Sequence, residues 1–324
     1  MNRRPNACGH SRRCCAAIPL ALAAMLFQGG LAGATELGGS SYPIGVELGY
    51  GDMLPPGLYN LAYYSHARAT SLKGNAGQDL GWARYRLTAD TISYRLQYIW
   101  NTTVFGASAE TAMALPFPAV DLEKRVSNAL PDTSGTRFAL TDPMIIPVRL
   151  AWKGDGVNQS AALEIVAPLG AYDANARVNT GRNYWQFAPA YALSWRPTAN
   201  SVYHLKLRYG INTKNKDTQY RSGDEFTTEF SAGYRLSPAA TLGLQGYFFR
   251  QTSDDELNGQ PTSSANGRLV GSGIGNRGSA NAIGPFLSYR ISPRFAVTGK
   301  YQQEFGVKNR GEFRRFWLQA LLPF

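Results

Sequence analysis

The stretch 313–324 restricts the fold more than any other part of the sequence. Counted back from residue 324, every second position is apolar, namely Phe324, Leu322, Ala320, Leu318 and Phe316. Side chains of a β-strand alternate between two faces, so these five are predicted to share one face of a strand. In a water-soluble protein such a face needs a covering layer, whereas lipid covers it in a transmembrane barrel. The stretch therefore predicts a barrel strand with its apolar face toward lipid.

The same alternation recurs along the chain and predicts twelve strands. In the clearest one, an apolar and aromatic face alternates with a face that carries His204, Lys206 and Arg208. The expected strands are 58–70, 81–100, 103–115, 141–152, 160–172, 182–196, 202–213, 225–236, 241–252, 281–291, 295–305 and 313–324. An even number lets the first strand pair with the last, which removes both edges of the sheet. The predicted fold class is all-β, a closed antiparallel transmembrane β-barrel.

The connections between these strands alternate in length, which predicts how the barrel is oriented. Short turns follow the even-numbered strands, and longer segments such as 116–140 and 253–279 gather at the other end. Bacterial outer-membrane barrels keep short turns in the periplasm and longer loops outside. The expected location is the cell outer membrane, with both ends of the barrel chain in the periplasm and outer-membrane lipid around the strands.

Residues 1–34 are interpreted as a signal peptide. Four arginines precede the apolar stretch 16–27, and Ala32-Gly33-Ala34 is typical of a cleavage site, so the exported chain would begin at Thr35. Twelve apolar residues are too few for a spanning helix, which needs about 20. All three cysteines lie in this leader, so the exported chain has no disulfide and no cysteine chemistry.

Residues 35–56 are rich in glycine and proline and show no sustained period. We interpret them as an N-terminal lead-in in the periplasm or the lumen, where they either plug the barrel or form a flexible tail. The barrel itself is expected to span 57–324.

Polar side chains on the inward face of the strands are the candidate functional surface. Charged residues on a lipid-facing surface cost about 2–4 kcal/mol at mid-membrane, so these charges are expected in the lumen. The predicted pathway residues are Arg95, Glu110, Arg149, Glu164, Arg196, His204, Lys206, Arg208, Glu229, Arg235, Phe286, Arg290, Lys300, Glu304, Arg315 and Trp317. Tyr64, His66, Tyr184 and Tyr247 are also expected inside, and Ile146 is expected toward lipid.

Two interpretations of this inward set remain open. Its positive excess favours a permeation path that attracts anionic or polarisable solutes, with the inward aromatic side chains suited to an aromatic solute. Alternatively, the arginines and glutamates pair with one another and fill a barrel that has no open pore.

Several other classes of function find little support. The formal net charge of the whole chain is +11, but it is spread out without a run of five basic residues, so no nucleic-acid partner is expected. No ligand cluster has metal-site spacing, and no cofactor is expected. A barrel hydrolase would need a nucleophile beside a histidine, yet neither His66 nor His204 lies in a G-x-S-x-G context.

Two motifs near the start of the exported chain resemble a known family. Tyr42 to Glu47 reads Y-P-I-G-V-E, and Leu54 to Tyr59 reads L-P-P-G-L-Y, followed by Y-R-L-Q-Y at Tyr94 to Tyr98. These segments are similar to the outer-membrane family named for the meta-pathway of phenol degradation, also called SphA-like. The resemblance implies a transporter of aromatic or hydrophobic compounds, and it implies no catalytic residues.

The combined expectation is a channel for passive uptake of small aromatic or hydrophobic compounds. A structural or adhesive barrel, with adhesion residing in the outer loops, is the alternative. By resemblance to other outer-membrane barrels, the terminal aromatic Phe324 would be read by the barrel assembly machinery. Truncation of Phe324 should then impair insertion before it affects transport.

Overall fold

The computed structural model describes residues 39–81, 84–125, 134–261, 277–292 and 295–322. The signal peptide expected at 1–34, the start at Thr35, most of the long loop at 253–279 and the terminal Phe324 lie partly or wholly outside these residues. None of the described residues belongs to a helix that is long and apolar enough to cross a membrane.

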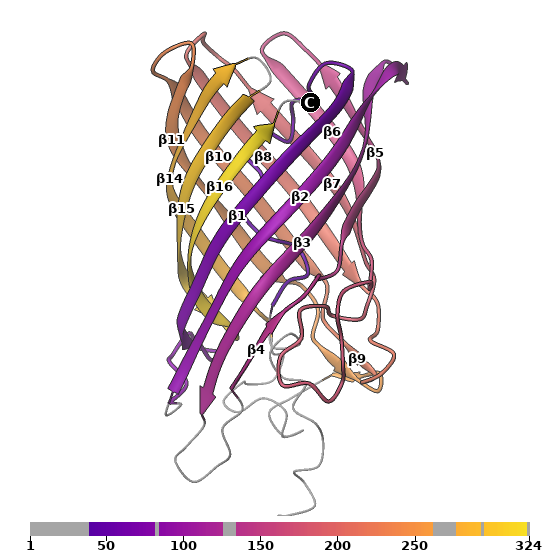
Figure 1. Ribbon diagram of the computed structural model, residues 1–324, viewed down its shortest axis with the longest axis vertical. Helices are drawn as coiled ribbons and strands as arrows, with labels where there is room; N and C mark the ends of the chain where they lie inside the picture. The colour runs from indigo at the N-terminus through magenta and orange to yellow at the C-terminus, as the bar shows by residue number, and fades with distance from the viewer. Residues whose placement is uncertain (1–38, 82–83, 126–133, 262–276, 293–294, 323–324) are drawn as a thin grey trace, which may run out of the picture. The chain divides into compact units, whose positions relative to one another are not determined.

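Twelve strands of the described chain form one closed antiparallel sheet (Figure 1). They are β1 Gly57–Leu72, β2 Arg84–Val104, β3 Ala107–Arg125, β5 Met144–Lys153, β6 Val157–Val166, β7 Gln186–Trp195, β8 Ser201–Asn212, β10 Glu225–Arg235, β11 Ala240–Gln251, β14 Ser279–Ser292, β15 Phe295–Lys308 and β16 Gly311–Leu322. Each strand pairs with its neighbours in sequence, and β1 closes onto β16 from Asn60 opposite Leu322 to Leu72 opposite Gly311. The predicted all-β fold, the number of strands and the closure are confirmed.

Period-two alternation separates the two faces of this sheet. Large apolar and aromatic side chains are exposed on the outside, for example Leu96, Leu205, Tyr209, Leu244 and Leu318. Aromatic residues gather near the short turns, where the rings of Trp195 and Tyr203 lie 5.3 Å apart between centroids. Positions with the opposite parity are mostly buried, and many of them are polar or charged. The exterior therefore suits lipid, with aromatic rings at one rim.

The third strand is longer than the sequence pattern indicated. Pro116 and Pro118 were expected to begin a long connection, but β3 continues through them to Arg125 and stays paired with β2. The carbonyl oxygen of Pro116 accepts a hydrogen bond from the backbone N of Thr141. The proline nitrogens therefore face the irregular link 139–143, where a missing donor disturbs no ladder. The short strand β4 (Gly135–Phe138) covers the edge beyond them.

A β-bulge reverses one predicted face. Ile146 was expected toward lipid, but it is buried inside the barrel, as is Arg149. Pro147 and Val148 are both exposed between them, and the register of β5 shifts here against both neighbouring strands. The bulge adds one residue to β5, so Ile146 and Arg149 both face inward although they are three positions apart.

The faces of β1 are also the reverse of the prediction for Tyr64 and His66. Both lie on the outside, where the Tyr64 hydroxyl donates to Asp90 at 2.7 Å and His66 Nδ1 lies 2.8 Å from the same carboxylate. Tyr63 and Ser65 face inward instead. The alternation of β1 could not decide between the faces because both carry aromatic and small polar residues.

A small sheet outside the barrel was not predicted. It joins β9 (Tyr220–Arg221), β12 (Glu256–Leu257) and β13 (Gln260–Pro261). The buried carboxylate of Asp255 holds it to the barrel rim, since it accepts hydrogen bonds from the Tyr220 hydroxyl, the Gly223 N–H at 2.8 Å and the Gln251 amide at 2.6 Å.

This carboxylate predicts a pH dependence of the outer sheet. Burial raises the pKa of Asp255 from 3.8 to about 6. The folded form therefore gains stability from the protonated carboxyl below pH 3.8, and loses it as the pH rises through about 6. We expect Asp255→Asn to slow hydrogen exchange of the backbone amides of 220–223 relative to the wild type above about pH 6, where the wild-type carboxyl is ionised. Below pH 3.8 the two proteins should exchange at the same rate. Equal exchange at all pH values would contradict the burial of an ionised carboxylate.

Closure of the sheet can be tested by a disulfide. Ala62 and Ala320 are register partners on the outer face of β1 and β16, and such pairs bring Cα atoms to about 4.5–5.5 Å. We expect Ala62→Cys with Ala320→Cys to form an intramolecular disulfide, detected as a cross-linked peptide by mass spectrometry. The matched control pairs Ala62→Cys with Ala232→Cys, which belongs to β10 and pairs with other strands. An open seam would leave both pairs reduced.

Candidate functional site

The stretch 39–52 lies inside the barrel and is bonded to its wall along its length. Near one end, the Ser40 hydroxyl donates to Glu225 and the backbone of Gly39 accepts from Arg182. At the other end Asp52 forms an ion pair with Arg196, just before the chain enters β1. We call this stretch the lumenal segment. A lead-in was expected, but its lack of periodicity gave no indication of its contacts.

The centre of the lumenal segment is held through its backbone. Glu229 accepts hydrogen bonds from the Gly45 N–H and from the Tyr42 hydroxyl at 2.9 Å. The Lys300 ammonium donates to the carbonyl oxygens of Gly45 and Val46, at 2.6 Å each. Gly45 has a φ of +84°, and a Cβ there would lie within 3 Å of side chains on β11 and β15. Only glycine fits this turn.

A second cluster joins the segment to β2, β3 and β5. Glu47 pairs with Arg95 at 2.9 Å, and Arg95 also contacts Glu110 at 3.1 Å. Arg149 forms a further ion pair with Glu110 and donates to the carbonyl oxygen of Tyr50 at 2.6 Å. Each buried charge in this cluster therefore has at least one opposite charge beside it, as burial in a low dielectric requires.

A third cluster lies on β6 and β8. The two oxygens of Glu164 accept from Lys206 and Arg208, each at 2.7 Å. Lys206 also donates to the Tyr42 hydroxyl at 3.0 Å and lies 3.8 Å from the centroid of the Tyr50 ring. The lumenal segment thus supplies the aromatic faces against which these cations pack.

Most of the residues predicted to line a pathway are inside and engaged in such contacts. Those that are buried in the lumen are Arg95, Glu110, Arg149, Glu164, Lys206, Arg208, Glu229, Phe286, Lys300, Glu304 and Trp317. Those that are half-buried are Arg196, His204 and Arg315. Arg235 and Arg290 are exposed near the short-turn ends of β10 and β14. The predicted set left out Tyr42, Tyr50, Glu225, Gln302 and Arg310. Tyr42, Tyr50 and Arg310 lie in the lead-in and a turn, where the alternation of strands gives no information. Glu225 and Gln302 lie on β10 and β15 with inward parity and were not included although the alternation places them there.

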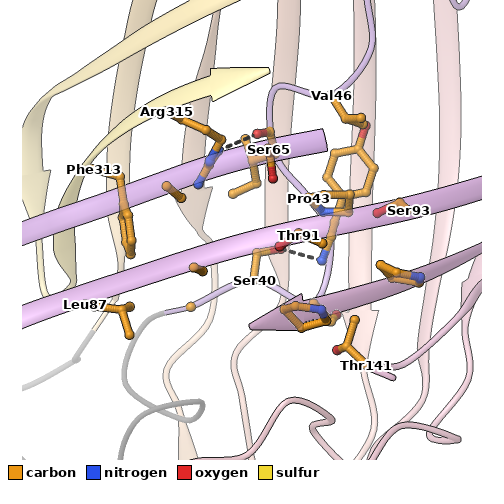
Figure 2. Close-up of a pocket in the computed structure, with 18 of the residues that line it drawn as sticks. Ser40, Pro43, Val46, Ser65, Leu87, Thr91, Ser93, Thr141, Phe313 and Arg315 are labelled. Atoms are coloured by element: carbon orange, nitrogen blue, oxygen red, sulfur yellow. Dashed lines mark hydrogen bonds between the residues drawn. The ribbon is translucent and has the colours of Figure 1, made fainter. Parts of the chain in front are cut away.

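A cavity of about 340 Å³ remains between the lumenal segment and the wall formed by β1, β2, β3 and β16 (Figure 2). The segment contributes Ser40, Pro43 and Val46, which face Thr91 and Ser93 of β2 in this view. The cavity extends to the end with the long connections, where Leu72, Leu122 and Arg310 line it. Most of its lining is apolar or aromatic, as in Tyr63, Leu87, Phe313 and Trp317. We call it the outer cavity.

The two carboxylates that line the outer cavity are both engaged. Glu47 is paired with Arg95. Asp142, in the link that precedes β5, accepts from the backbone N–H groups of Arg182 at 2.6 Å and Gly170 at 2.9 Å. Burial raises the pKa of Asp142 although these hydrogen bonds oppose the shift. Neither acid offers a free negative charge to the cavity.

The structure also brings together a serine and a histidine that the sequence kept apart. Ser194 Oγ lies 2.7 Å from His204 Nδ1. The serine is fully buried, and a Cβ added at Gly51 of the lumenal segment would stand 2.7 Å from its Oγ. A substrate therefore has no room to approach this oxygen while the segment is in place. Among the described residues no group of three or more acidic, histidine or cysteine side chains could hold a metal ion.

The sequence matches the family described as "Putative MetA-pathway of phenol degradation" over residues 69–320. The chain belongs to this family. It is similar in fold to an outer membrane channel from Pseudomonas putida F1, with 16% identity, a TM-score of 0.73, and coverage of 86% of this chain and 100% of that one. The β domain of the Bordetella autotransporter BrkA is less similar, with 11% identity, a TM-score of 0.48, and coverage of 83% of this chain and 100% of that one. No curated protein matches the sequence.

The third charge cluster predicts a large effect on stability. Glu164→Gln leaves Lys206 and Arg208 without their common carboxylate in a buried site. We expect the free energy of unfolding to fall by about 3 kcal/mol or more, measured by urea unfolding in lipid vesicles with tryptophan fluorescence.

The matched control is Glu312→Gln. This carboxylate is partly exposed and 3.5 Å from Lys73, so its loss should cost less than about 1 kcal/mol. Equal effects of the two substitutions would show that the Glu164 cluster does not stabilise the barrel.

Proposed function

We propose that this protein is an outer-membrane channel for the passive uptake of small aromatic or hydrophobic compounds. The observation that carries the proposal is the outer cavity, an apolar space inside a closed barrel that reaches the end with the long connections. Family membership and the similar fold of the Pseudomonas putida channel support it. Lipid would surround the apolar exterior, the signal peptide 1–34 would direct export, and the assembly machinery would read the last strand.

The same structure contains the main alternative. Ion pairs and the lumenal segment fill much of the lumen, as a purely structural barrel would require. The outer cavity favours transport because a structural barrel gains nothing from a space of 340 Å³ lined by aromatic side chains. Passage beyond this cavity then requires the lumenal segment to move.

Polar contacts hold the backbone of the segment, while its side chains Ile44 and Val46 are packed in the hydrophobic cluster of the lumen. Its backbone oxygens at Tyr50, Gly45 and Val46 accept from wall side chains, so water can replace these partners if the segment shifts. In this proposal the wall charges hold the segment when it is closed and line an aqueous path when it opens.

Uptake can be measured in whole cells. Cells that carry the full chain should accumulate a radiolabelled monoaromatic compound such as toluene faster than cells that lack it, and a sugar of similar size should show no difference. Equal aromatic uptake by the two strains would leave the structural or adhesive interpretation.

Removal of residues 39–52 should widen the path. The variant is expected to conduct ions several-fold better than the wild type in planar bilayers, because the segment no longer fills the lumen. Heat-modifiable migration on a denaturing gel reports whether the shortened chain still forms a barrel. A folded variant with unchanged conductance would show that the segment does not restrict the path.

A further inference from the structure

Arg315 differs from the other arginines that line the outer cavity. It lies on β16, and its Nη1 donates to the carbonyl oxygen of Ile44 at 2.8 Å (Figure 2). Within the described part of the chain, no carboxylate forms an ion pair with it. By contrast, Arg95 pairs with Glu47 and Glu110, and Arg310 lies 3.3 Å from Glu304. Arg315 therefore keeps an uncompensated positive charge at the cavity wall.

The surroundings of this charge are aromatic. The Arg315 guanidinium carbon lies 5.8 Å from the ring centroids of both Phe313 and Trp317. These rings and Leu87 also line the cavity. A planar cation beside flat apolar surfaces is the arrangement that accepts a ligand with a ring and a negative charge.

More basic than acidic side chains line the outer cavity. Five basic residues and two acidic ones line it, and both acids are already engaged. The basic residues are Arg95, Lys124, Arg182, Arg310 and Arg315. Next to Arg315 along the wall, Arg310 is buried, and its Nε and Nη1 have no hydrogen-bond partner among the described residues. Because Arg95 and Arg310 have carboxylate partners, Arg315 is the residue that leaves positive charge at the cavity wall, and this charge favours an anion over a cation.

We propose, building on the function proposed above, that the outer cavity binds a small aromatic monocarboxylate. The ring lies against Phe313, Trp317 and Leu87, and the carboxylate accepts hydrogen bonds from the Arg315 guanidinium. A carboxylate matches this group because its two coplanar oxygens can accept two parallel hydrogen bonds from an arginine. The space suits one aromatic ring, since a cavity of about 150 Å³ already holds benzene and this one measures about 340 Å³.

The test compares benzoate with benzamide, a neutral analogue of the same shape, on the full chain in lipid nanodiscs by titration calorimetry. The wild type should bind benzoate at least about tenfold more tightly than benzamide. Arg315→Gln should remove this preference by weakening benzoate at least about tenfold, with benzamide unchanged. Arg315→Lys keeps the charge but loses the planar fork, so it should restore only part of the preference.

The matched control is Arg290→Gln, which removes the same charge from an exposed position near the end of β14. It should leave both affinities at the wild-type values. Heat-modifiable migration confirms that each variant has formed a barrel, and benzamide binding by Arg315→Gln shows that its cavity is intact.

Equal binding of benzoate and benzamide by the wild type would overturn the inference. So would an Arg315→Gln variant that binds benzoate as well as the wild type does. If either result is found while cells still take up toluene, the uptake function stands and only the carboxylate preference falls. If toluene uptake is absent but benzoate binding depends on Arg315, the site is present and the uptake function falls.

Discussion

The structure depends on the closure of the backbone hydrogen-bond ladder between β1 and β16. With a neighbour on both sides, each strand satisfies its own peptide groups, so the exterior needs no polar side chains and can be apolar. Charged residues at mid-membrane then favour the interior. A buried charge is costly unless an opposite charge lies beside it. The paired carboxylates Glu110 and Glu164 follow from closure as directly as the apolar exterior does.

The lumenal segment belongs to this balance of charges. It contributes the carboxylates Glu47 and Asp52, and its carbonyl oxygens accept from Lys300 and Arg149. Lys300 and Arg149 are therefore engaged in holding the segment, whereas Arg315 has no carboxylate partner among the described residues. This separates two roles that the alternation of strands could not separate. In the proposed function, the charges that hold the segment determine whether the path opens, and the outer cavity determines what enters it.

Much of the fold could be predicted because a strand in a barrel wall has only two environments. A period of two then reports which face each residue occupies, as it does for β8 and β16. The prediction failed where a strand contained an extra residue, where both of its faces had a similar composition, or where a proline stood inside it. The bulge at Pro147 shifted the parity of Ile146, both faces of β1 carry similar residues, and Pro116 resembled a strand end although its ring nitrogen faces no ladder.

The candidate site was predictable only as a set of inward residues, because periodicity gives the face of a side chain and not its partner. Arg208 and Arg315 both lie on the inward face of their strands, and nothing in the local sequence distinguishes them. The contacts that do so come from far along the chain. Arg208 donates to Glu164, which is 44 residues away, whereas the hydrogen bond that Arg315 forms within the described residues goes to a backbone oxygen 271 residues away. One charge is neutralised by the barrel and the other is not. The outer cavity owes its affinity for anions to that difference.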